Sequence, residues 1–353
     1  MEIIFPIDGD MLHAGDGVVD GGRLRVEVVV EAAPASSIRI GGVGAVEKEG
    51  QYVAGIVLGG YENTIEIRNE TTGEEKTVRV YWLPNFLNGY RLSIDDNIWF
   101  LRDIHQHERV YKSIFDNPYL AFLRGVHDVY GTKVHINLFY QTDGFDLSQL
   151  SDAFASEWKA QASWLRLSFH ALAEFPDKPY QEADYMTVRR DGQRVMNEIR
   201  RFAGPELMGP VTTLHWGEAT VEGSRALRDL GYKGQLGYFN VDDELPAVSY
   251  YLDVQQRRHI KKRFIWKDNR EGIVFIRSSI VIDKTGLADI RPQLDGYRSK
   301  GGLPPYVDLL VHEQYYYPFY FNYQPDFRER ILTAVGWAAN NGYEPKFLEE
   351  CIF

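Results

Sequence analysis

From Tyr90 onward, short apolar runs typical of strands alternate with longer amphipathic stretches typical of helices. The predicted strands are 90–94, 134–140, 164–169, 211–214, 234–239, 272–282 and 307–311. The predicted helices are 112–130, 147–161, 183–203, 221–229 and 326–340. Strands joined through helices form parallel sheets, because a parallel pair needs a long crossover connection. Roughly six to eight such units in residues 86–353 fit a (β/α) barrel.

The first 85 residues carry a different pattern. Their apolar and polar residues alternate over short runs, separated by turn signals such as IDGD, DGG and GGYEN. These runs are 24–30, 37–40, 52–58, 64–68 and 76–81. The pattern predicts a small all-β sandwich, immunoglobulin-like in architecture only. Because Pro84 and Gly89 punctuate the change of composition, we expect two domains, 1–85 and 86–353.

Two adjacent acids, Asp95 and Asp96, end the first predicted strand of the second domain. Neighbouring carboxylates at the end of a buried strand repel each other and cost desolvation energy unless a cation or a proton uses them. At the carboxyl end of a barrel strand both uses are natural, because catalytic residues gather there. The alternative is that the pair caps a helix or lies on a solvated turn.

Three of the nine histidines also follow directly on predicted strands of the second domain. His170 follows the strand 164–169, His215 follows 211–214 and His312 follows 307–311. Each alone could be a structural histidine that bonds a backbone carbonyl. Together with the aspartate pair, they favour a metal site combined with acid and base catalysis.

The chemistry assigns a role to each of these residue types. A divalent ion held by a carboxylate and imidazoles lowers the pKa of bound water and polarises a carbonyl group. We therefore expect Asp96 and His170 to be metal ligands, Asp95 the base and His312 the acid. Glu174 follows His170 by four residues, so on a helix it would share one face and could complete the ligand set. Pro176 would end such a helix early.

Composition excludes several other classes of protein. A net charge of −11 argues against a nucleic-acid partner, which needs a basic surface. The sequence has no run of 18 apolar residues for a membrane span and no signal-peptide pattern at its start, so we expect a cytoplasmic protein. The single cysteine, Cys351, excludes an intrachain disulfide and a cysteine-based zinc cluster. The sequence does not define an oligomeric state.

With these residues placed, the second domain resembles the polysaccharide deacetylases of the NodB-homology kind (carbohydrate esterase family 4). SIDD (93–96) resembles the strand-end T/S-F-D-D motif of that family, and HDVYGTKVHINLFY (127–140) resembles the helix–strand segment that follows it. SFHALAE (168–174) stands where the family has its H-S/T-x-x-H metal motif, and LLVHE (309–313) resembles the late L-x-x-H-D motif. The tail 327–350 is similar to the closing helix and strand.

The resemblance implies a NodB-type barrel and a hydrolase that removes acetyl groups from a carbohydrate with zinc or a similar divalent ion. It places Asp95 at the base position, Asp96 and His170 at metal positions and His312 at the acid position. The chain departs from the family where Glu174 replaces the second metal histidine. The family's R-x-P-Y/F-G motif is also missing, and LHWGEAT (214–220) occupies its place, so His215 substitutes for the arginine or joins the metal.

Aromatic residues supply the candidates for substrate binding. Trp99 and Trp216 flank the proposed site. The segment 312–324 carries seven Tyr or Phe residues, among them Tyr315, which could stack on sugar rings or could pack as an interface. We therefore expect His215, Trp216, Trp99 and Tyr315 to contact substrate.

Two other functions stay open from the sequence. The first is a carbohydrate-binding protein that kept the barrel and lost the chemistry, because the arginine motif is absent. The second is a glycoside hydrolase that uses two carboxylates, Glu174 with Glu218 or Glu313.

Overall fold

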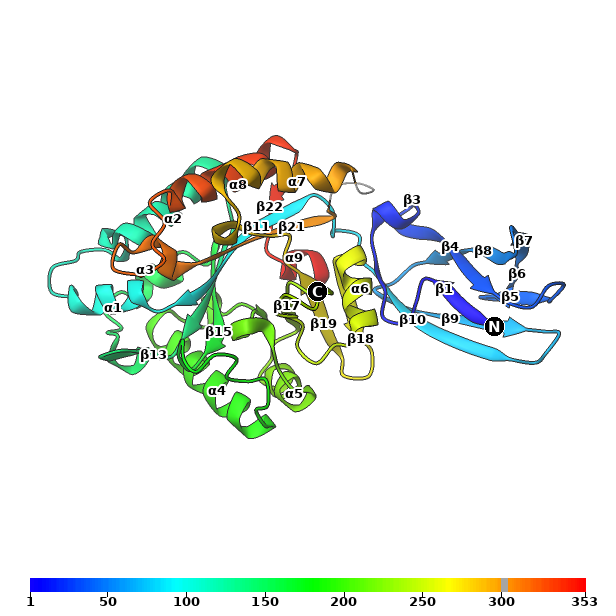
Figure 1. The fold of residues 1–353 in the computed structure, drawn as a ribbon, viewed down its shortest axis with the longest axis horizontal. Helices are drawn as coiled ribbons and strands as arrows, with labels where there is room; N and C mark the ends of the chain where they lie inside the picture. The colour runs from blue at the N-terminus through cyan, green and yellow to red at the C-terminus, as the bar shows by residue number, and fades with distance from the viewer. Residues whose placement is uncertain (300–303) are drawn as a thin grey trace. The chain divides into compact units, whose positions relative to one another are not determined.

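A computed structural model describes residues 1–299 and 304–353, and the chain divides into two compact units (Figure 1). The first unit comprises Met1–Leu87, Ile265–Gly272 and Cys351–Phe353. The second unit comprises Asn88–Phe264 and Ile273–Glu350.

The first unit is built from short β-strands. They are β1 (Glu2–Phe5), β2 (Met11–Leu12), β3 (Val18–Asp20), β4 (Arg23–Glu31), β5 (Ile38–Ile40), β6 (Val43–Gly44), β7 (Val46–Lys48), β8 (Gln51–Leu58), β9 (Glu62–Asn69), β10 (Glu75–Trp82) and β18 (Ile265–Asp268). One sheet has the order β1-β4-β8-β7 with β3 also on β4, and another has the order β2-β10-β9-β5-β6. Alternate side chains of β4, β8, β9 and β10 are buried in one hydrophobic core that both sheets share.

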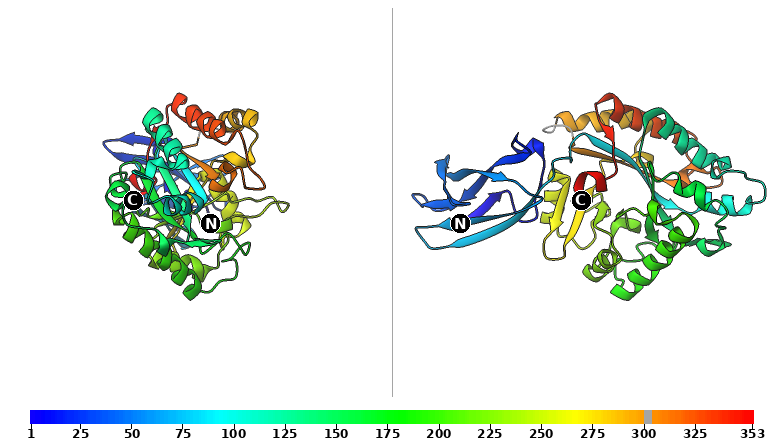
Figure 2. Two further views of the ribbon diagram at one scale, coloured as in Figure 1. Left: turned by 90° about the vertical axis from the view of Figure 1, so that its left-hand side faces the viewer. Right: turned by 180° about the vertical axis from the view of Figure 1, so that it is seen from behind.

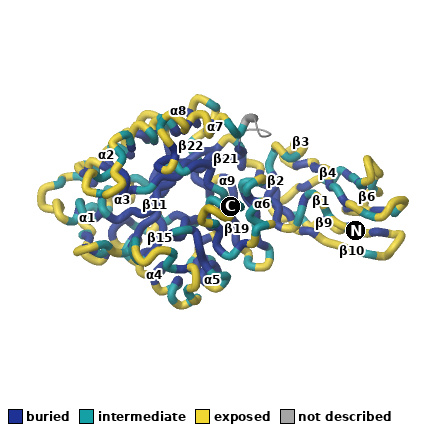
Figure 3. The backbone as a smooth tube through the Cα atoms, viewed as in Figure 1, coloured by how far each residue is buried: buried dark blue, intermediate teal, exposed yellow. Residues whose placement is uncertain are grey.

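The second unit contains parallel strands. They are β11 (Gly89–Asn97), β12 (Val134–Phe139), β15 (Leu165–Ala171), β16 (Val211–Thr212), β17 (Gly234–Gly237), β19 (Ile273–Arg277), β20 (Ile280–Val281) and β21 (Tyr306–His312). One sheet has the order β15-β12-β11-β21-β20, with the short strand β22 (Glu344–Pro345) also paired to β11, and β16-β17-β19 form a second sheet. A small hairpin joins β13 (Gln141–Thr142) to β14 (Phe145–Asp146). Strands flank both edges of β11, and every residue of this strand is buried, as is typical of a parallel sheet that is covered on both faces (Figure 3).

Helices connect these strands and cover their outer faces. They are α1 (Trp99–Gln106), α2 (Pro118–Tyr130), α3 (Ala155–Lys159), α4 (Tyr185–Phe202), α5 (Val221–Asp229), α6 (Val254–Arg263), α7 (Ile290–Ser299), α8 (Phe327–Asn340) and α9 (Glu349–Ile352). α8 packs on β21, α2 and α7, and α4 packs on β15 and α5 (Figures 1 and 2). The prediction of parallel strands alternating with helices is confirmed.

Local sequence explains where these helices start and stop. α2 begins after Asn117, whose side chain accepts a hydrogen bond from the amide of Leu120 at 3.0 Å, and Pro118 occupies its first position. It ends at Gly131, which has φ 68° and so adopts the left-handed conformation that glycine favours. The predicted helix 147–161 is shorter than expected, because only Ala155–Lys159 is α-helical and Leu147–Gln149 forms a separate 3-10 turn.

The strands of the second unit do not form one continuous ladder among the described residues. Between β15 and β16, side-chain hydroxyls replace ladder bonds, since Ser168 Oγ donates to Val211 O at 2.9 Å and Thr212 Oγ1 donates to Phe169 O. The predicted strand 272–282 is divided at Ser278–Ser279 into β19 and β20, which belong to different sheets. Within the described residues, no helix has the length and apolar character that a membrane crossing requires.

Candidate metal centre and active site

Asp95 and Asp96 lie inside β11 at a local irregularity of the strand. The pairing of β11 with β12 shifts register between Ile94 and Asn97, and Asp96 has φ 63°. Successive side chains of a regular strand point to opposite faces, so an irregularity is what lets two neighbours face one site. The side-chain amide of Asn97 stabilises this irregularity of the strand. Its Nδ2 atom donates to the backbone oxygens of Ile94, Asp95 and Asn137 at 2.8, 3.0 and 3.1 Å.

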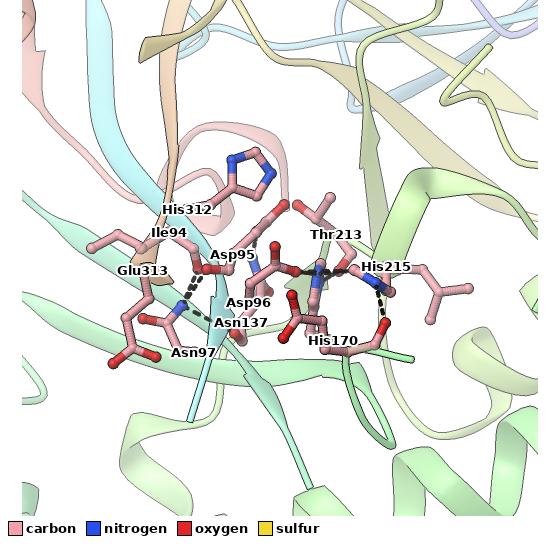
Figure 4. Close-up of polar contacts among 12 residues, drawn as sticks. Ile94, Asp95, Asp96, Asn97, Asn137, His170, Thr213, His215, His312 and Glu313 are labelled. Carbon is pink, nitrogen blue, oxygen red and sulfur yellow. Dashed lines mark hydrogen bonds and ion pairs between the residues drawn. The ribbon is translucent and has the colours of Figure 1, made fainter. Parts of the chain in front are cut away.

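Asp96, His170 and His215 bring three potential metal-ligand atoms to within 4.8 Å of one another (Figure 4). Asp96 Oδ1 lies 2.8 Å from His170 Nε2 and 3.0 Å from His215 Nδ1. The two ring nitrogens are 3.2 Å apart. All three side chains are buried, and they come from β11, β15 and the 3-10 turn His215–Gly217.

In each imidazole, the ring nitrogen that faces away from the cluster hydrogen-bonds a backbone carbonyl oxygen. His170 Nδ1 lies 2.5 Å from Thr213 O, and His215 Nε2 lies 3.0 Å from Glu174 O. A carbonyl oxygen can only accept, so each of these nitrogens carries the hydrogen. Two ring nitrogens and a carboxylate oxygen therefore converge, and their lone pairs repel unless a proton or a cation lies among them. Metal-ligating histidines are oriented in this way.

Ionisation within the cluster follows from these contacts. Burial opposes the ionisation of Asp96, but the charge of His215 and hydrogen bonds from both imidazoles hold the pKa of Asp96 well below its ordinary value. Burial likewise disfavours a charged His170, but the charge of Asp95 and the hydrogen bond to Asp96 outweigh it and raise the pKa of His170. Without a metal, these contacts thus favour the anionic form of Asp96 and the protonated form of His170.

Asp95 lies beside this cluster with a different environment. Its side chain is 2% exposed, and its Oδ1 accepts a hydrogen bond from Asn137 Nδ2 at 2.7 Å. Burial raises the pKa of Asp95, and this outweighs the opposing charges of His170 and His312. A carboxylate with a raised pKa is a better proton acceptor at neutral pH than an exposed one.

His312 ends β21, where it pairs in register with Asp95 on β11. Its Nδ1 lies 2.9 Å from Asp283 Oδ1 and 3.1 Å from Asp283 Oδ2, and the Asp283 side chain is fully buried. Burial acts against the charged imidazole, but the charge and hydrogen bond of Asp283 raise the pKa of His312 to about 9. His312 therefore carries a proton at neutral pH, and its Nε2 can give one to a bound molecule.

Glu174 lies outside the three-residue cluster. The helix that would have placed it beside His170 does not form, because β15 continues through Ala171 and the following residues are irregular. Its backbone carbonyl, rather than its carboxylate, contacts His215. Burial and the negative charge of Asp96 raise the pKa of Glu174 to about 7.

A cavity of about 830 Å³ opens onto the site. Its lining includes Asp95, Asp96, His170, His215 and His312. Trp216 and Tyr315, two of the predicted substrate contacts, also line it. Trp99 does not, because its ring packs against Tyr317, Phe319 and Tyr320 with centroids 5.5, 4.9 and 5.6 Å away.

The aromatic residues of the segment 312–324 fall into two groups: some pack inside the fold, and others line the cavity. Tyr316 and Tyr317 pack against Tyr119 with ring centroids 5.0 and 6.2 Å away, which is an internal packing role. Tyr315, Tyr320 and Phe321 line the cavity. The segment therefore both anchors itself to the fold and contributes rings to the site.

The glutamates considered for glycoside hydrolysis lie elsewhere. Both carboxylate oxygens of Glu313 accept hydrogen bonds at the start of α1, from the amides of Ile98, Trp99 and Phe100 at 2.7, 3.0 and 2.7 Å. Glu313 and not the aspartate pair thus caps this helix. Glu218 accepts from the Val248 amide at 3.1 Å. Among the described residues that line the cavity, Glu174 is the only glutamate.

Two polar partners in the site were not predicted. Asp283 follows the predicted strand 272–282 directly, as the three histidines follow theirs, and this position is a signal that could have identified it. Asn137 lies within a predicted strand, and its contact with Asp95 depends on the register of β12 against β11.

No protein-family model and no curated protein sequence matches this chain. Its structure is similar to that of a carbohydrate esterase family 4 (CE4) pseudoenzyme from Bacillus anthracis, with 9% identity, a TM-score of 0.40 and coverage of 82% of this chain and 84% of that one. It is also similar to a peptidoglycan N-acetylglucosamine deacetylase, with 10% identity, a TM-score of 0.39 and coverage of 76% and 90%.

A 4-alpha-glucanotransferase from Thermococcus litoralis matches with 11% identity and a TM-score of 0.48, over 75% of this chain and 40% of that one. At identities of 9 to 11% and TM-scores below 0.5, none of these similarities identifies the function of the chain.

Proposed function

We propose that the chain is a metal-dependent hydrolase that removes acetyl groups from a carbohydrate. The observation that carries this proposal is the convergence of Asp96 Oδ1, His170 Nε2 and His215 Nδ1, with the other nitrogen of each imidazole held by a backbone carbonyl. One carboxylate and two imidazoles with further positions open is a donor set that suits catalytic zinc. This assignment uses His215 in place of Glu174 as the third ligand.

The donor atoms fit a divalent cation for a reason internal to the site. Because Thr213 O and Glu174 O fix the tautomers, the inward nitrogens of His170 and His215 are free to donate their lone pairs. A cation among them would remove the repulsion between these lone pairs and the Asp96 carboxylate. When bound, such an ion supplies a Lewis acid that polarises an acyl carbonyl and lowers the pKa of a coordinated water.

The remaining groups move protons. Asp95 is buried and held by Asn137, so its carboxylate is positioned to take a proton from the attacking water. Asp283 holds His312 as an imidazolium, and the His312 Nε2 proton is available for the departing nitrogen or oxygen. An acid and a base with separated pKa values are what a hydrolysis of this kind requires.

The cavity supports a sugar as the group that carries the acetyl. Trp216, Tyr320 and Phe321 contribute rings to its lining, and sugar rings stack on aromatic side chains. Four buried polar atoms of residues that line it lack a hydrogen-bond partner within the described part of the chain: Thr213 Oγ1, Trp216 Nε1, Ser278 Oγ and Gln314 Oε1. Such groups suit a hydroxyl-rich ligand.

The test combines metal content with acetate release. We expect about one divalent ion per chain in protein loaded with zinc and dialysed, and its loss in His170→Ala. The loaded protein should release acetate from acetylated oligosaccharides, and Asp95→Asn should keep the metal while turnover falls. Release of reducing sugar without acetate would select the glycoside hydrolase. Failure to bind zinc or cobalt, together with measurable glycan binding, would select the binding protein.

A further inference from the structure

The turn that carries His215 has a backbone conformation that needs support. Trp216 has φ 65° and Gly217 has φ 57°, so two successive residues lie in the left-handed region. A tryptophan rarely adopts this conformation, and such residues persist only where the surrounding contacts hold them. Contacts that fix this turn therefore also fix where the His215 ring points.

Tyr250 contacts the turn at both of its ends. Its backbone amide donates to Gly217 O at 2.5 Å, and its hydroxyl oxygen accepts from the Leu214 amide at 3.2 Å. The hydroxyl proton is donated to Leu236 O at 2.7 Å, which ties the turn to β17. Tyr250 is 4% exposed, and its φ of 58° also lies in the left-handed region. One buried residue thus joins both ends of the turn to a neighbouring strand.

The segment 238–250 holds Tyr250 in this position. Its residue Val248 packs against Gly217, where a Cβ atom would come within 2.7 Å of the valine side chain. The Val248 amide donates to Glu218 Oε1 at 3.1 Å, and the Val248 carbonyl accepts from two backbone amides at the start of the segment, both at 3.1 Å. Val248 also lines the cavity. The segment that supports the His215 turn is therefore part of the cavity wall as well.

We propose that Tyr250 is a positioning residue for His215, because it holds the turn 214–217 so that His215 Nδ1 stays beside Asp96 and His170. Asp96 and His170 lie on β11 and β15 of one sheet, whereas His215 follows β16 of the other sheet. The position of His215 thus depends on the contacts of its turn rather than on pairing with the strands that carry the other two residues. Where the inference concerns metal affinity, it rests on the proposed function.

The first measurement uses metal-free protein and tests the positioning alone. His215 Nε2 donates to Glu174 O at 3.0 Å, so its proton should give a slowly exchanging downfield NMR signal that is missing in His215→Gln. Tyr250→Phe removes only the hydroxyl, so the Leu214 amide loses its acceptor. We expect the His215 signal to broaden or vanish in this variant, because the turn becomes mobile. An unchanged signal overturns the positioning role.

The second measurement is metal binding. We expect Tyr250→Phe to bind zinc about tenfold more weakly than wild-type protein, since loss of a group that orients a metal ligand costs about 10–100-fold in affinity. With cobalt in place of zinc, the visible absorption spectrum should shift, because the donor geometry changes. A loss of stability alone would reduce the folded fraction and leave the spectrum of the cobalt-bound protein as it is. An unchanged affinity and spectrum would contradict the proposal.

Tyr343→Phe is the matched control. Tyr343 is 5% exposed and its hydroxyl donates to Pro304 O at 2.7 Å, but it does not line the cavity. This variant loses a comparable hydrogen bond and should keep the His215 signal, the zinc affinity and the cobalt spectrum. If it changes them as much as Tyr250→Phe does, the positioning role is overturned. Failure of wild-type protein to bind zinc or cobalt overturns the proposed function instead, and the His215 signal of metal-free protein then decides the role of Tyr250.

Discussion

The contact between Asp283 and His312 allows the sharpest prediction about the site. Asp283 is fully buried, and its two carboxylate oxygens lie 2.9 and 3.1 Å from His312 Nδ1. The pKa of His312 rises from 6.5 to about 9 despite burial, and Asp283 provides the leading interactions that raise it. This rise corresponds to about 3 kcal/mol in favour of the imidazolium. We expect Asp283→Asn to lower the pKa of His312 by roughly two pH units.

The assay is an NMR titration of the imidazole protons in metal-free protein, in which the spectrum of His312→Gln assigns the resonance. Asp152→Asn, at an exposed position outside the cavity lining, is the control and should leave the titration unchanged. A pKa that stays near 9 in Asp283→Asn would refute the claim that this carboxylate holds the proton on His312.

The same substitution tests the role of His312 in catalysis. A general acid must be protonated, so activity is lost as pH rises through its pKa. In wild-type protein this loss should occur near or below pH 9, because a bound cation disfavours the imidazolium. In Asp283→Asn the alkaline limb of kcat should move to lower pH. An alkaline limb that does not move would show that His312 is not the acid.

Four further predictions follow from the site. His170→Ala and His215→Ala should each abolish zinc retention, whereas Glu174→Gln should keep it, as measured by elemental analysis after dialysis. Asp95→Asn should retain zinc and lose about 10²–10⁴-fold in kcat, since proton transfer to a positioned carboxylate is removed. Zinc affinity should fall as pH decreases, because the raised pKa of His170 lets protons compete for its inward nitrogen, and isothermal titration at several pH values would show this. Glu313→Ala should destabilise the second unit by about 2–5 kcal/mol in denaturant unfolding, because three backbone donors at the start of α1 lose their partner.

The strand ends could be predicted from the sequence because they depend on local patterns. Runs such as WLRLSF and VDLLV are too apolar to be exposed, and polar residues directly after them must lie at the edge of a sheet. This reasoning placed Asp95, Asp96, His170 and His312 in one region, and the structure brings them to one cavity. Their individual roles stay predictions.

The partners within the site could not be predicted because they depend on distant parts of the chain. Whether His215 faces Asp96 depends on the turn at Trp216, which has φ 65°, a conformation that a tryptophan rarely adopts. The choice of Glu174 assumed a helical spacing that the continuation of β15 removes. The Asn137 contact required the strand register, which a single-residue slip would change.

The position of the three inward-facing groups has a consequence for how the second unit holds together. Asp96 and His170 belong to the sheet that contains β11 and β15, whereas His215 follows β16 of the other sheet, and no backbone ladder joins β15 to β16 among the described residues. An ion shared by these side chains would act as a cross-link between the two sheets. Loading and removal of the ion should therefore alter the rate of amide hydrogen exchange at the boundary between β15 and β16. The change should be much smaller at β11 and β21, because backbone hydrogen bonds already join these two strands.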